Sequence, residues 1–397
     1  MLRWASLPAE ILTRVFQTIQ STKQLGECRL VHRTWDSSAE SAMFSREISV
    51  RDCLAFQRLY YHLRRKPAKG RLIRYLNLDF DNVHMDRSSL KHAFKLFFTP
   101  NLEVLKGEML SQHGGIGYEI IREIVYESTQ EFNKLRYLSN TQFTTELYWE
   151  TVSLFKQSLQ RLDLQFTDCD DMMGKDNKYL INHVVLEIGE FKQLKHLNLQ
   201  MFYDDSIVEM DKVLNQCEYL QHLRAAISMN QPESLEDYFQ INEIKKIDKL
   251  RSLLLYTDPG ESPILLEYCT TKYPNIERIV YESPDGPPGF AEDMESFSRE
   301  LEILNAVPYY EIEFMLHPDD SIEDIRNTLK TDKNDVVIDV LDDNPFPESR
   351  GKEVGVKVTS TSSTSEPCHL EISVASKAMK NGDNGLADPA SGIAYSA

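Results

Sequence analysis

The stretch Leu194-Lys195-His196-Leu197-Asn198-Leu199 decides the fold, because its leucines are separated first by two polar residues and then by one. Successive side chains of a β-strand point to opposite faces, so Leu197 and Leu199 share one face while His196 and Asn198 share the other. The segment therefore predicts a short strand with one apolar face and one polar face.

The same spacing returns along the middle of the chain, with helix-like sequence between the copies. Clear copies span 73–78, 159–164 and 250–255, and weaker copies extend the series to 309–314. The mean interval is about 30 residues, which is typical of solenoids built from repeated strand and helix units. The alternative is a doubly wound α/β domain, which the short alternating strands and the missing phosphate fingerprint disfavour.

The first 48 residues contain three short helix-like segments that are rich in large apolar side chains. Pro8 suits the first turn of a helix, where its missing N–H leaves no hydrogen bond unmade. Ser21, with Gln24 three residues later, predicts the cap of a second helix. Three short helices cannot bury so many large side chains by themselves, so we expect some of this surface to meet another chain or the next domain.

The order of residues in this segment resembles an F-box. The match runs from Leu-Pro-x-Glu-Ile-Leu-x-x-Val-Phe at 7–16 to Trp35, and it departs from the family at 32–34, where many members have a Cys-Lys/Arg pair. The resemblance implies docking on a Skp-type adaptor and, through it, on a cullin–RING ubiquitin ligase. The adaptor-binding residues that it implies are Leu7, Pro8, Ile11, Leu12, Phe16, Leu25, Cys28, Val31 and Trp35. A helical cap that packs on the next domain is the plainer alternative.

Together, these patterns predict an α/β chain with a three-helix F-box, a leucine-rich-repeat α/β solenoid (a horseshoe) and a disordered C-terminal tail. We place the F-box at 1–48, a basic linker or helical connector at 49–72, the irregular solenoid at 73–341 and the tail at 342–397. The tail is rich in Pro, Gly, Ser and Asp, a composition that buries too little apolar surface to offset the entropy of ordering.

The alternation of each strand also predicts which side chains line the polar face of the sheet. The substrate-binding candidates on that face are Arg161, His196, His222, Arg224 and Arg278. Guanidinium groups on a rigid sheet bind carboxylates and phosphates through paired hydrogen bonds, so this set favours an acidic or phosphorylated protein target. An ordinary solvated strand face is the alternative.

Charge and composition limit the remaining classes. The net charge of −18 argues against nucleic-acid binding, although residues 1–75 carry 14 Lys/Arg against 6 Asp/Glu. No apolar run reaches the ~18 residues of a transmembrane helix, so we expect no membrane partner. Six scattered cysteines without a C-x-x-C pair give no zinc spacing and favour reduced thiols in the cytoplasm, the nucleus or both.

No motif in the sequence predicts catalysis. The run Gly114-Gly115-Ile116-Gly117 lacks the third glycine and the lysine of a nucleotide site, so we expect no catalytic residue, cofactor or metal. The basic run 64–74 suits a nuclear-localisation signal or a solvated linker. The function predicted from the resemblance is a non-enzymatic substrate-recognition subunit of an SCF-type E3 ubiquitin ligase. The alternative is a leucine-rich-repeat interaction scaffold that never meets a ligase.

Overall fold

The computed structural model describes most of the chain up to residue 316 and three short segments after it. The described residues are 7–80, 85–140, 143–167, 177–202, 206–228, 244–257, 262–283, 299–300, 302–304, 306–316, 335–341, 354–361 and 372–373.

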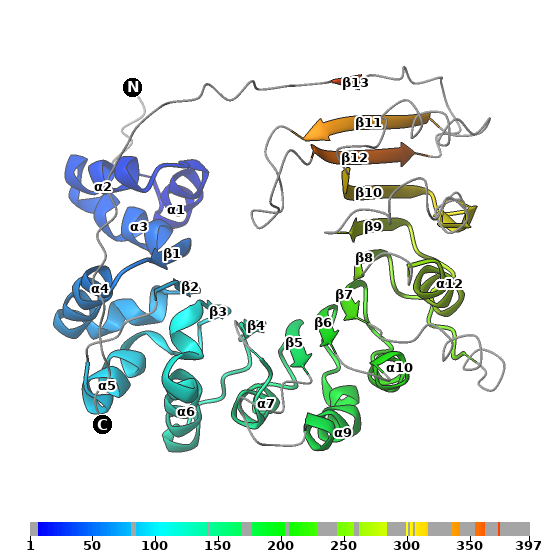
Figure 1. Cartoon of the computed structure of the whole chain (residues 1–397). Coiled ribbons are helices and arrows are strands. Elements are labelled where there is room, and N and C mark those ends of the chain that lie inside the picture. The colour runs from blue at the N-terminus through cyan, green and yellow to red at the C-terminus, as the bar shows by residue number, and fades with distance from the viewer. Residues whose placement is uncertain are drawn as a thin grey trace, which may run out of the picture.

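One continuous sheet runs through the described chain, and its first ten strands are parallel and follow the order of the sequence. They are β1 (Glu47–Val50), β2 (Tyr75–Leu78), β3 (Val104–Lys106), β4 (Tyr137–Leu138), β5 (Arg161–Thr167), β6 (His196–Phe202), β7 (His222–Ser228), β8 (Ser252–Thr257), β9 (Arg278–Ser283) and β10 (Tyr309–Leu316). Their order lacks the reversal at which a doubly wound sheet changes direction. The sheet curves into an arc with the strands on the inner side and helices outside (Figure 1).

Helices connect the strands along the outer side of the arc. They are α4 (Cys53–Arg65), α5 (Arg87–Phe97), α6 (Gln112–Glu127), α7 (Glu146–Ser153), α9 (Asn177–Glu187), α10 (Ser206–Gln216) and α12 (Ser262–Lys272), with the 3-10 turns η2 (Pro67–Leu72), η3 (Glu108–Leu110) and η4 (Ile188–Glu190). Side-chain caps begin several of them: Asp52 accepts from the Ala55 N–H at 2.7 Å and Asp86 from the Ser89 N–H at 3.0 Å. Such caps satisfy N–H groups that have no partner within the helix.

A single core lies between the strands and the helices. From β2 to β9 the second residue of each strand enters this core. The register aligns Leu76, Leu105, Leu138, Leu162, Leu197, Leu223, Leu253 and Ile279, all buried. This apolar row orients every strand, because a slip of one residue would turn these side chains to the solvent.

Three helices at the N-terminus form a smaller unit with a core of its own. These are α1 (Ala9–Thr18), α2 (Thr22–Val31) and α3 (Arg33–Phe44), packed around Leu12, Phe16, Leu25, Ala39 and Ala42. The predicted cap is confirmed, because the Ser21 hydroxyl accepts from the Gln24 N–H at 3.3 Å. Glu40 joins the unit to the arc by pairing with Arg29 at 2.8 Å and with Lys69 of η2.

The C-terminal strands correct the fold class predicted from the sequence. β12 (Val354–Thr361) lies antiparallel between β10 and β11 (Asp335–Leu341), and β13 (Ile372–Ser373) pairs with β11. The expectation of a disordered tail is therefore wrong for 354–361 and 372–373, where the eight residues of β12 and the two of β13 pair with other strands. The valine and threonine residues at 354–361 suit a strand.

The beginning of the sheet requires a second correction. β1 lies before residue 73 and pairs with β2 along its whole length, so the sheet begins before the predicted solenoid, while α4 and η2 make most of 49–72 helical. The fold is an α/β chain on one long sheet, parallel from β1 to β10, and not an F-box joined by a linker to a leucine-rich-repeat horseshoe with a disordered tail. Every helix in the described ranges is too short or too polar to cross a membrane.

A buried ion pair joins α10 to α12. Lys272 has no exposed side-chain area, and its Nζ lies 2.6 Å from Asp211 Oδ1 and 2.6 Å from Asn215 Oδ1. The Tyr268 hydroxyl donates to the same Asp211 oxygen. Burial lowers the pKa of Lys272, and the hydrogen bond and charge of Asp211 act against that shift. The contact between α10 and α12 thus depends on the buried ammonium group of Lys272, which is stabilised by Asp211 and Asn215 and not by solvent.

Lys272→Met should lower the free energy of unfolding by about 3–5 kcal/mol, because it leaves the Asp211 carboxylate buried without its partner. Urea unfolding measures this loss. The double variant Lys272→Met/Asp211→Leu should recover most of it, since apolar replacement of both partners is often neutral. Lys156→Met breaks the exposed pair with Glu190 and should change little. A double variant as unstable as the single one would contradict the prediction.

Candidate functional site

The first residues of the parallel strands form one row across the inner side of the arc. The register aligns Glu47, Tyr75, Val104, Tyr137, Arg161, His196, His222, Ser252, Arg278 and Tyr309. We call this the inner row. Neighbouring strands are ~4.8 Å apart, so adjacent side chains of the inner row contact one another. Their direction is fixed because the next residue of each strand is held in the core.

Two histidines occupy the middle of the inner row. The rings of His196 and His222 are stacked, with centroids 4.4 Å apart and planes inclined by 6°. Both residues are exposed. Partial burial lowers the pKa of His196, and the nearby charges of His222, Arg161 and Lys195 lower it further. The stack therefore favours a neutral His196, since two stacked imidazolium ions would repel each other.

Arg161 stands beside this pair and is held by its neighbours. Its Nε and Nη2 each donate to Asp163 Oδ1 at 3.2 Å, and its guanidinium lies 4.6 Å from the centroid of the Tyr137 ring. The Tyr137 hydroxyl donates to the other carboxylate oxygen of Asp163. Half of the Arg161 side chain is exposed, so it is fixed in place while part of its surface faces the solvent.

Arg224 and Arg278 lie on the other side of the histidines. Arg224 is exposed two residues after His222, and its neighbour across the sheet is Asn198. The buried Oδ1 of Asn198 has no hydrogen-bond partner in the described part of the chain. Arg278 is two strands beyond His222, with its guanidinium 5.2 Å from the centroid of the Tyr309 ring. The structure thus brings four of the five predicted residues together and leaves Arg278 at the edge of the group.

Sequence reasoning missed the residues that hold Arg161. Tyr137 is the register partner of Arg161, and Asp163 follows Arg161 by two residues on β5, so the strand pattern placed all three on one side of the sheet. Which of them pair depends on side-chain conformations, and Asp163 is buried although its position predicted an exposed residue. The buried Oδ1 of Asn198 was missed because the pattern predicted an exposed residue there too.

The predicted adaptor-binding residues do not form one surface. Leu12, Phe16 and Leu25 lie in the core of the three-helix unit, and the Trp35 ring packs edge-on against Phe16 at 5.5 Å. Leu7 and Cys28 are half-buried, while Pro8, Ile11 and Val31 are exposed. Leu30 and Val15 are also exposed, although the prediction did not include them.

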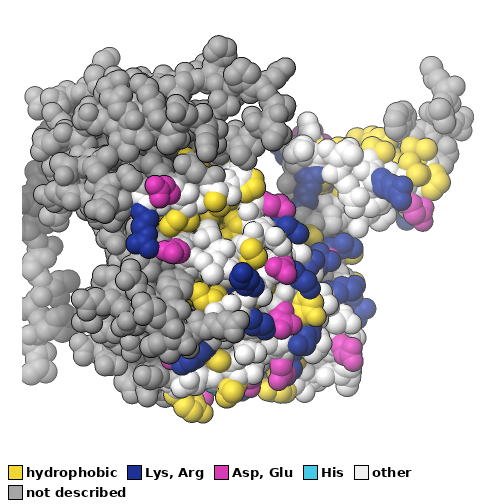
Figure 2. Space-filling view, turned by 90° about the vertical axis from the view of Figure 1, so that its right-hand side faces the viewer, with side chains coloured by type: hydrophobic (Ala, Val, Ile, Leu, Met, Phe, Trp, Pro, Cys, Tyr) yellow, Lys and Arg dark blue, Asp and Glu magenta, His cyan; other side chains and the backbone are white. Residues whose placement is uncertain are grey.

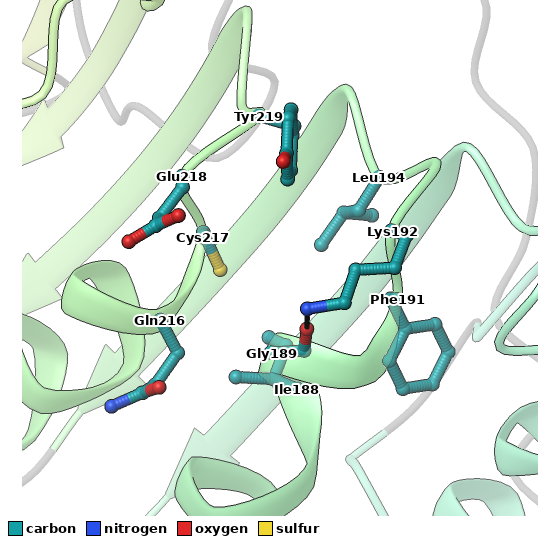
Figure 3. A pocket seen from close by; sticks show the side chains of 9 residues that line it. All are labelled: Ile188, Gly189, Phe191, Lys192, Leu194, Gln216, Cys217, Glu218 and Tyr219. Carbon is teal, nitrogen blue, oxygen red and sulfur yellow. Dashed lines mark hydrogen bonds between the residues drawn. The ribbon is translucent and has the colours of Figure 1, made fainter.

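A small pocket of about 160 Å³ opens before strands β6 and β7 (Figure 3). Its Lys192 Nζ donates to the Gly189 carbonyl at 2.8 Å, and its Glu218 pairs with Lys245 at 2.9 Å. Burial raises the pKa of the Cys217 thiol to about 12, which makes it unreactive. With both charged groups already paired, this pocket is a weaker candidate than the inner row.

On the side drawn in Figure 2, the Lys and Arg side chains of the described residues lie interleaved with Asp and Glu. Across the described residues, no group of three or more His, Cys, Asp or Glu side chains could hold a metal ion.

Comparison with known proteins gives this chain no family. No family model matches it, and no curated protein matches it. Among solved structures, a putative class I S-adenosylmethionine-dependent methyltransferase from Listeria monocytogenes is similar over 92% of this chain and 91% of that chain, with 10% identity and a TM-score of 0.21. Similarity this low transfers neither fold nor activity to the chain.

These comparisons correct the family predicted from the N-terminal motif. No family model matches the chain, that of F-box proteins included, so the assignment to F-box proteins with leucine-rich repeats is withdrawn. The predicted roles as an SCF substrate receptor or a leucine-rich-repeat scaffold are withdrawn with it. So are the expected Skp, cullin and RING partners, the protein target and the statement that the chain is not an enzyme.

His196→Phe should reduce the loss of stability on acidification. The pKa of His196 is lowered in the folded chain, so the unfolded chain takes up the proton first. The neutral His196 ring therefore makes its full contribution to the free energy of unfolding above about pH 6.5. That contribution is lost as the pH falls from there through the lower pKa of His196 in the folded chain. Phenylalanine keeps the stacked ring but cannot titrate.

Thermal unfolding midpoints at pH 7.5 and pH 5.5 measure this effect. The wild-type midpoint should fall more between the two pH values than that of His196→Phe. An equal or larger fall in the variant would show that the stacked pair does not set this pH dependence.

Proposed function

We propose that the chain binds the anionic group of a ligand, a carboxylate or a phosphate, on the inner side of the sheet, at His196 and His222 of the inner row and at Arg224, two residues after His222 on β7. The observation that carries this proposal is the exposed histidine stack, flanked on the sheet by Arg161 and Arg224.

The geometry suits an anion because its donors are already ordered. A guanidinium binds an oxyanion through two parallel N–H groups, and each neutral imidazole offers one further N–H. Asp163 and Tyr137 hold Arg161 before any ligand arrives. Groups that are fixed in advance lose little conformational entropy on binding, which strengthens the interaction.

Protonation of the histidines would add positive charge to the same surface. Arg161 and Lys195 disfavour the charged form of His196, whereas an oxyanion within hydrogen-bonding distance would favour it. Ligand binding and proton uptake are therefore coupled, and binding of an anion should raise the pKa of His196.

We also propose that the chain works in the cytoplasm, the nucleus or both. The observation that supports this location is that Cys28, Cys53, Cys217 and Cys269 are all free thiols. Free thiols are typical of reducing compartments.

Arg224→Glu should weaken the binding of inorganic pyrophosphate by about tenfold or more, because it replaces a donor by a like charge. Isothermal titration calorimetry at fixed ionic strength measures the affinity. Arg122→Glu is the matched control: Arg122 lies on the outer helix α6, paired with Glu150 at 2.5 Å, and makes the same change of net charge. This variant should bind pyrophosphate as the wild type does.

Two results would contradict the proposal. Unchanged pyrophosphate binding by Arg224→Glu would show that the surface around His196, His222 and Arg224 is not the binding site. An equal loss in Arg122→Glu would show that pyrophosphate responds only to the overall charge of the chain.

A further inference from the structure

A second pocket, of about 470 Å³, lies on the helical side of the sheet between η2, the end of α5 and the end of α6. Its volume is within the range of small-molecule sites. It is formed by close packing of η2 on α5: a Cβ on Gly70 would lie 1.6 Å from the Leu96 carbonyl oxygen, so only glycine allows this approach.

The wall of this pocket is apolar and well ordered. The rings of Phe98 and Phe132 are stacked, with centroids 5.0 Å apart and planes inclined by 20°. Ile124 and Pro100 continue the same wall, and Phe98 is 2% exposed. A surface of this kind favours an alkyl or aryl group, which gains by leaving water.

The rim carries positive charge and one unused hydroxyl. Arg71 lines the pocket, is exposed, and has no ion-pair partner among the residues that the structure describes. Lys95 also lines it and pairs with Glu127 at 2.8 Å. The hydroxyl of Thr99, another lining residue, is buried and lacks a hydrogen-bond partner in the described ranges. A buried hydroxyl without a partner is costly, so a ligand that reached it would gain a hydrogen bond.

The backbone near Arg71 is held in position from the next repeat. The Asn101 side-chain amide donates to the Arg71 carbonyl at 3.0 Å and accepts from Lys134 Nζ at 2.8 Å. Arg71 thus has a fixed main chain and a side chain that can turn toward a ligand, while Lys134 adds a third positive charge near Arg71 and Lys95.

We propose that this pocket binds a small amphiphilic carboxylate. The alkyl chain lies against Phe98, Ile124 and Phe132. The carboxylate pairs with the Arg71 guanidinium and accepts a hydrogen bond from the Thr99 hydroxyl. The charge run 64–74, which the inner row does not use, contributes Arg71 to the positive rim. This pocket is separate from the inner row, so a negative result for octanoate does not contradict the proposed anion site, and a negative result for pyrophosphate does not contradict this pocket.

Octanoate is the probe, measured by calorimetry and by displacement of the fluorescent anion 1-anilinonaphthalene-8-sulfonate from the full chain. Arg71→Glu should weaken octanoate binding about tenfold or more, because the carboxylate then meets a like charge. Ala68→Phe should also weaken it by filling the pocket. Arg64→Glu, which changes a nearby exposed arginine outside the pocket, should bind as the wild type does.

Thr99→Val tests the hydroxyl without threatening the fold. It should weaken octanoate binding by several fold while leaving the thermal midpoint of the free chain unchanged or higher. Octanol, which has the same tail without the charge, should bind at least tenfold more weakly than octanoate. The proposal is overturned by the absence of saturable octanoate binding, by equal affinity of Arg71→Glu and the wild type, or by octanol binding as tightly as octanoate.

Discussion

The apolar row at the second position of each strand is the constraint on which the rest of the structure depends. Each of these leucines is held between the sheet and a helix, and the register carries the alignment from β2 to β9. Because side chains alternate along a strand, burial of this row directs the residues before and after it to the inner side of the arc. The hydrophobic core therefore determines where the polar side chains of the inner side lie, although the core residues themselves contact no ligand.

That placement brings unlike chemistries into contact along the inner row. Arg161 gains a hydrogen-bonded partner in Asp163 and an aromatic face in Tyr137, whereas His196 lies between Arg161 and the stacked imidazole of His222. The arginine is fixed and remains charged, and the histidine responds to pH and to nearby charge. A surface that pairs a fixed cation with titratable rings can bind an anion more tightly as protons are taken up.

The positions of the strands could be predicted from the sequence because buried and exposed residues alternate along each strand. The pattern placed Arg161, His196 and His222 on one face, and the register puts them side by side. It could not show that Asp163 would neutralise part of Arg161, because that contact depends on side-chain conformations. Nor could it show that Leu12, Phe16 and Leu25 would fill the core of the first three helices, since an apolar side chain is equally suited to a core and to an interface. Strand β12 was missed because the Pro, Gly, Ser and Asp residues around it predicted disorder. The short segment in which valine alternates with other residues at 354–358 was given less weight.

The distribution of ion pairs explains how an acidic chain keeps a basic inner face. Carboxylates of the described helices pair with cations of the adjacent helix on the outer side, as between α5 and α6. Arg87 contacts Glu119 and Glu123, and Lys91 contacts Glu123 and Glu127. Exposed pairs of this kind add little stability individually. These pairs neutralise carboxylates on the convex side, and solvent and counterions screen them further. On the inner side, Asp163 is already engaged by Arg161 and Tyr137, so the local charge there differs from the net charge of −18.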